Sequence, residues 1–123
     1  MTYNIQYKQG DVDTVGNILS DDDGVLDLTG KTVTLVMVDI ATESIPYEID
    51  CILGGWVKTN GILTYYSAAR GGVTAQFSAV ETLTSGEFKG EFVVVGSTST
   101  VHIPSGNNYL SIMIWEKVGI RTT

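Results

Sequence analysis

LSDDDGVLDLTGKTVTLVM, residues 19–37, decides the fold, because its pattern alternates between strand and turn. An acidic run at 21–23 ends in Gly24, and glycine at such a position favours a tight turn. Thr29-Gly30 forms a second turn before the strongest strand, 32–39. Successive side chains of a strand point to opposite faces, so this strand presents one apolar face of Val33, Leu35 and Met37.

The same period of two recurs along the chain, and no stretch keeps a helical period. Residues 78–83 have loose helical spacing but are too short for a structural helix, so a single turn or an irregular crossover is expected. Many short strands separated by turns predict two packed antiparallel sheets, an all-β sandwich. The expected strands cover 3–7, 15–20, 26–28, 32–39, 47–53, 56–59, 62–65, 73–77, 87–94, 100–103 and 109–115.

A β-hairpin is predicted around residues 56–66, where Asn60-Gly61 separates two β-rich runs. A two-residue turn pairs Trp56 with Tyr65, and the neighbours Tyr65 and Tyr66 then face opposite sides. Burial of at least two of these three aromatic residues in the core is one interpretation. The other is a protein interface, for which the candidate residues are Trp56, Tyr65, Tyr66 and Trp115.

The size and charge of the chain limit what it can do. Its 123 residues fit a single domain, assigned to 1–118, followed by a polar tail at 119–123. The net charge of −7 disfavours binding to nucleic acid or to anionic membranes. There is no apolar run long enough to span a bilayer. Residues 1–7 have neither the basic nor the apolar region of a signal peptide, so export by one is not expected. The lone cysteine, Cys51, is interpreted as a small core residue in a protein made in a reducing cytoplasm.

No residue cluster predicts a catalytic, cofactor or metal site, so an enzyme is not expected. His102 alternates with apolar neighbours on a strand, which favours a structural role, although Ser105 is close in sequence. The acidic run 21–23 could offer oxygen ligands to calcium, but it lacks the spacing of a calcium-binding loop. Glu87 and Glu91 lie on one strand face with Lys89 between them, which predicts a charge-balanced surface.

Several motifs resemble the N-terminal domain of phage baseplate upper proteins (BppU-type). Gly10-Asp11 matches the family's opening, residues 27–33 (DLTGKTV) match its Asp-Leu-Thr-Gly-x-Thr-Val block, and Met37 matches a methionine in the strand that follows. Residues 86–92 (GEFKGEF) and the ending at 101–114 are also similar to the family pattern. The stretch 54–71 is inserted where the family has a short turn.

The resemblance implies an immunoglobulin-like antiparallel β-sandwich carrying an inserted hairpin. It also implies a structural protein of a tailed-phage virion, made in the host bacterial cytoplasm. Such a protein would be an adaptor or assembly domain at the tail, baseplate or neck that binds other virion proteins, in multiple symmetric copies. The family has no catalytic residues to carry over. Two alternatives remain open: a capsid head decoration protein, or a host-surface carbohydrate-binding module with Trp56 and Tyr65 as its aromatic platform.

Overall fold

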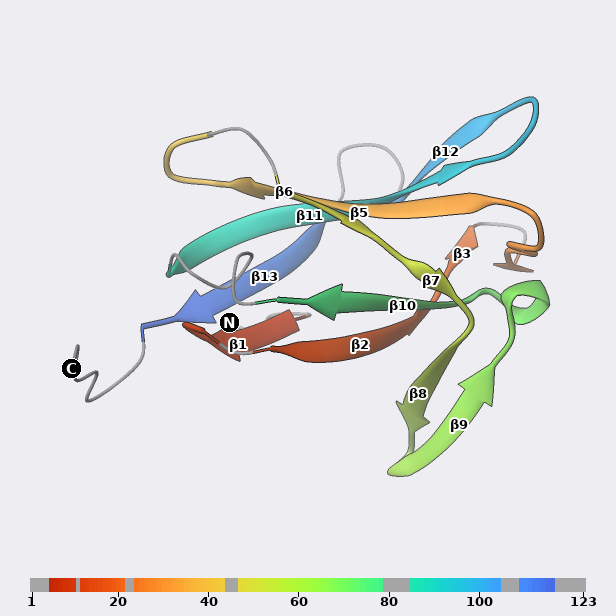
Figure 1. Ribbon diagram of the computed structural model, residues 1–123, viewed down its shortest axis with the longest axis horizontal. Helices are drawn as coiled ribbons and strands as arrows, with labels where there is room; N and C mark the ends of the chain where they lie inside the picture. Colours follow the sequence, from red (N-terminus) through yellow and green to blue (C-terminus); the bar gives the residue numbers. More distant parts are fainter. Residues whose placement is uncertain are drawn as a thin grey trace.

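The computed structural model describes residues 5–10, 12–21, 24–43, 47–78, 85–104 and 109–116. Nearly all the regular structure within them is β-strand, arranged in two layers that face each other (Figure 1). The predicted all-β sandwich is therefore confirmed. The predicted tail at 119–123 and the turn or crossover proposed for 79–83 lie outside the described residues.

The larger layer is a six-stranded sheet, and the smaller one has three strands. In the larger sheet β1 is parallel to β13, and the other pairings are antiparallel. Its order is β1 (Ile5–Lys8), β13 (Leu110–Trp115), β11 (Gly86–Val95), β5 (Thr32–Asp39) and β6 (Tyr47–Asp50), with β12 (Thr100–Ile103) also beside β11. The smaller sheet has the order β2 (Asp13–Ile18), β10 (Gly72–Phe77), β7 (Ile52–Leu53). A short ladder joins β3 (Ser20–Asp21) to β4 (Gly24–Val25).

The core lies between the two sheets and is made by the strand faces that alternation predicts. Buried and exposed positions alternate along β5 and β11, as expected for strands with one face against a core. The smaller sheet adds the inward face of β10. The largest fully buried side chains are Phe77, Phe88, Phe92, Leu28, Leu35, Met37, Ile112, Ile114, Val33 and Val73.

The predicted hairpin is present as β8 (Gly55–Thr59) and β9 (Ile62–Tyr66). Asn60 and Gly61 have φ values of 52° and 80°. Two successive positive φ angles belong to the two-residue hairpin turn whose twist matches that of the flanking strands. The register pairs Trp56 with Tyr65 and Thr59 with Ile62, as predicted from the sequence.

Two strand predictions were wrong in detail. Residues 47–53 do not form one strand, because the chain leaves the larger sheet after Asp50 and joins β10 in the smaller sheet at Ile52. Residues 26–28 form no strand either. Their backbone groups find separate partners: the Leu26 N–H donates to the Leu19 carbonyl and the Leu28 N–H to the Ala68 carbonyl.

The Asp-Leu-Thr-Gly block at 27–30 is a turn that fixes a core residue. The Thr29 backbone N–H donates to Asp27 Oδ1 at 3.0 Å, and the Lys31 N–H donates to the Leu28 carbonyl at 3.0 Å. Hydrogen bonds from the side chain and the backbone of Thr29 lower the pKa of Asp27, since they favour its charged form. Gly30 has a φ of 75°. Between these polar groups, Leu28 is fully buried.

Asn17 is a polar residue on the inward face of β2. It is opposite the buried Val73, and no partner for its buried Nδ2 is present in the described part of the chain. A buried donor without an acceptor costs about 1–3 kcal/mol. We therefore expect Asn17→Val to raise the free energy of unfolding by about 1 kcal/mol, as measured by urea denaturation. Thr14→Val, at an exposed position of the same strand, is the control for β-propensity. A destabilised Asn17→Val protein would contradict the assignment.

Candidate functional site

The hairpin packs against the outer side of the smaller sheet at positions where glycines allow the two backbones to come close. This contact is named the seat of the hairpin. A Cβ atom at Gly16 on β2 would collide with the Trp56 carbonyl oxygen, and one at Gly72 on β10 would collide with the Tyr66 carbonyl oxygen. A Cβ at Gly55 would lie 2.8 Å from the Val73 carbonyl oxygen. Backbone therefore rests on backbone at the base of the hairpin. From this seat β8 and β9 extend away from the layer of β5 and β11 (Figure 1).

One face of the hairpin is apolar and exposed. Side chains on alternate residues share a face, and the register brings together Trp56, Lys58, Leu63 and Tyr65. These four residues are named the hairpin face below. Trp56 is 58% exposed, Leu63 58% and Tyr65 48%. The Trp56 and Tyr65 rings contact each other edge to face, with centroids 5.3 Å apart and an interplanar angle of 64°. The structure thus brings these two predicted site residues together on the surface.

The other two predicted site residues lie elsewhere. Tyr66 points to the opposite face, is partly buried, and is covered by the Arg70 guanidinium, 4.7 Å from its ring centroid. Trp115 ends β13 in the larger sheet, and its Nε1–H donates to Gln6 Oε1 at 3.1 Å. The interpretation that two of the three hairpin aromatics are core residues was wrong. Trp56 and Tyr65 share the face that points away from the seat, which sequence alternation cannot distinguish from a buried face.

His102 and Cys51 lie in different surroundings. His102 Nδ1 is 2.8 Å from Glu91 Oε1, and both side chains are substantially exposed. Ser105 lies outside the described residues. Burial raises the pKa of the Cys51 thiol to about 11, so it stays protonated at neutral pH. Cys51 also marks the point where the chain passes from β6 to β7.

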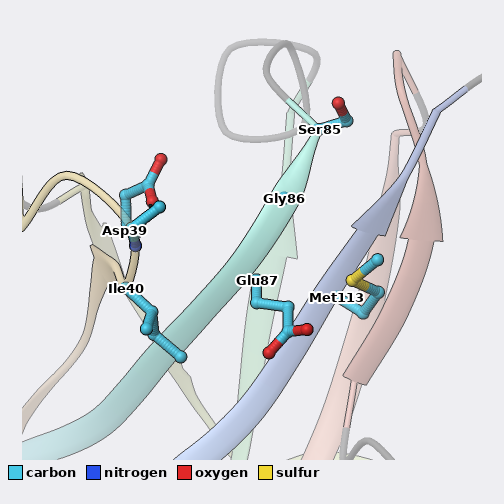
Figure 2. Close-up of a pocket in the computed structure, with 7 residues that line it drawn as sticks. Asp39, Ile40, Ser85, Gly86, Glu87 and Met113 are labelled. Atoms are coloured by element: carbon cyan, nitrogen blue, oxygen red, sulfur yellow. Dashed lines mark hydrogen bonds between the residues drawn. The ribbon is translucent and has the colours of Figure 1, made fainter.

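An open hollow of about 490 Å³ lies where β5 ends beside β11 and β13 (Figure 2). The Asp39 carboxylate accepts the Ala41 N–H at 2.9 Å and so closes its own turn. The Ile40 N–H donates to the Glu87 carbonyl at 3.0 Å. No histidine is among the described residues that line it. The described lining residues are Asp39, Ile40, Ala41, Ser85, Gly86, Glu87 and Met113.

Within the described residues, no three His, Cys, Asp or Glu side chains gather into a group that could hold a metal ion. This statement does not extend to the whole acidic run 21–23, because Asp22 and Asp23 lie outside the described residues. The described part of the chain has no helix of the length and hydropathy needed to cross a membrane.

Neither a family model nor a curated protein nor a solved structure matches this chain. The hairpin face is therefore the candidate site on structural grounds alone.

Proposed function

We propose that this chain is a structural protein of a tailed-phage virion, an adaptor at the tail, baseplate or neck that binds other virion proteins through the hairpin face. The observation that carries the binding role is the exposed cluster of Trp56, Leu63 and Tyr65 on a hairpin that extends from the sandwich. Exposed aromatic residues on a seated, regular element are typical anchors of protein interfaces. The assignment to a phage virion rests on the motifs that resemble baseplate upper proteins.

The strand order supports the immunoglobulin-like part of the proposal. If the short β3, β4, β8, β9 and β12 are omitted and the other strands are lettered along the chain, the larger sheet has the spatial order A′, G, F, C, C′ and the smaller sheet the order B, E, D. This is how immunoglobulin-type sandwiches divide their strands. The inserted hairpin then lies between strands D and E, so it extends the sandwich without interrupting either sheet.

The carbohydrate-binding alternative receives less support from the ring geometry. A flat aromatic platform would need the Trp56 and Tyr65 rings nearly coplanar, whereas they lie 64° apart. The edge-to-face contact instead makes a raised ridge, with Leu63 as the next side chain along β9 on the same face. A ridge of this kind fits a complementary protein surface better than the face of a sugar ring.

The test is incorporation into phage particles after truncation of the hairpin face. Trp56→Ala combined with Tyr65→Ala is expected to leave the unfolding midpoint nearly unchanged, because both side chains are exposed, and to reduce incorporation at least tenfold. The copy number in purified particles, determined by quantitative mass spectrometry, is the measurement. Tyr109→Ala is the matched control, since Tyr109 is 49% exposed and does not lie on the hairpin. Normal incorporation of the double variant would refute the proposal.

A further inference from the structure

Charge is distributed unevenly along this chain. All 14 acidic residues lie outside residues 51–80, a segment whose only charged residues are Lys58 and Arg70. The segment thus carries +2 and the rest of the chain −9, which together give the net charge of −7. Because this segment includes the whole hairpin, the hairpin face is an apolar surface with one cation on an otherwise acidic protein. A surface of this kind fits an acidic partner with an apolar centre.

The outer side of the larger sheet has these properties over β5 and β6. The strand register places Glu91, Val36 and Glu48 in one row across β11, β5 and β6, and Val93, Thr34 and Asp50 in the next row. These side chains point away from the core, because the alternate residues Val33 and Leu35 point into it. Glu48 and Asp50 are exposed, whereas Val36 and Val93 are half-buried. Val36, Glu48, Asp50 and Val93 are named the acidic face; Glu91, next to Val36, is in contact with His102.

The two faces cannot meet within one molecule. The acidic face is on the outside of the larger sheet, and the hairpin extends from the opposite layer in the opposite direction (Figure 1). A contact between them therefore joins two copies through different surfaces. An interface of this type builds a ring if its rotation closes and a filament if it does not.

We propose that the hairpin face of one copy docks on the acidic face of a second copy. Trp56 and Leu63 cover Val36 and Val93, and the Lys58 ammonium group pairs with the carboxylates of Glu48 and Asp50. The proposal deepens the proposed function by naming another copy of this chain as the partner of the hairpin face. Because the contact joins unlike surfaces, each copy can dock on one neighbour and be docked on by another, so association can continue beyond a dimer.

Sedimentation velocity of the full chain across a wide concentration range is the test. Wild-type protein should self-associate, and the association should weaken as salt screens the Lys58 pairing. Trp56→Ala should weaken it about thirtyfold. Glu48→Lys with Asp50→Lys should abolish it. Glu43→Lys with Glu116→Lys makes the same change in net charge outside the acidic face and should leave it intact.

Mixing the variants tests whether the hairpin face binds the acidic face of another copy or whether each face binds the same face of another copy. The Trp56→Ala protein keeps an intact acidic face, and the Glu48→Lys, Asp50→Lys protein keeps an intact hairpin. An equimolar mixture should form dimers and nothing larger. A mixture that stays monomeric, or wild-type protein that is monomeric at every concentration, would overturn the proposal. If the hairpin variants nevertheless fail to enter particles, the proposed function stands and the partner is a different protein.

Discussion

Replacing Gly16 with valine should lower the free energy of unfolding by about 3 kcal/mol. Gly16, on the edge strand β2, pairs with Thr74 on the central strand β10 of the smaller sheet, and its missing side chain leaves room for the Trp56 carbonyl. A side chain there can be accommodated only if β2 or β8 moves, because the atom it meets is main chain rather than the end of a flexible side chain. Lifting β8 would also disturb Gly55, which lies against the Val73 carbonyl.

Urea denaturation followed by tryptophan fluorescence measures this loss, and limited proteolysis of the hairpin shows whether β8 has lifted. Gly96→Ala is the control. A Cβ at Gly96 would have its nearest neighbour, Lys31 Cε, at an ordinary 3.5 Å, and we expect a change within about 0.5 kcal/mol. A Gly16→Val protein with wild-type stability and a protease-resistant hairpin would show that the hairpin does not rest on β2.

This seat explains why part of the site could be predicted from the sequence and part could not. The turn at Asn60-Gly61 fixes its own register, so the pairing of Trp56 with Tyr65 follows from local sequence. The role of Gly16 does not follow, because its neighbour is forty residues away in the chain. From the sequence alone Gly16 only weakens a strand. Without the seat, the side of the hairpin that stays exposed cannot be deduced.

The fold shows the same division between local and distant causes. Alternation predicts the buried faces of β5 and β11 because one face of each strand meets the core along its whole length. The passage from β6 to β7 at Cys51 leaves no such signal, since apolar alternation continues through it. The change of sheet takes place within one residue: the Cys51 N–H still donates to the Val33 carbonyl of the larger sheet, while Ile52 already pairs with Thr74 of the smaller one.

Leu28→Ala should destabilise the protein by about 2–5 kcal/mol, although Leu28 belongs to no strand. Its side chain is fully buried, and removing it leaves a cavity that the surrounding strands can only partly fill. The backbone on either side is held by hydrogen bonds, from the Leu28 N–H to the Ala68 carbonyl at 2.8 Å and from the Lys31 N–H to the Leu28 carbonyl. Collapse of the turn into the cavity would break these bonds.

Leu63→Ala is the matched control, because it removes the same atoms from a leucine that is 58% exposed on the hairpin face. We expect it to change the free energy of unfolding by no more than about 0.5 kcal/mol in dilute solution. Chemical denaturation of the two variants side by side shows whether the loss of stability comes from the burial of Leu28 or from replacing any leucine by alanine. Equal losses would mean that the turn at 27–30 does not anchor the core. A large loss for Leu28→Ala alone would give the Asp-Leu-Thr-Gly block a structural cause: its polar residues form the turn that holds this leucine between the sheets.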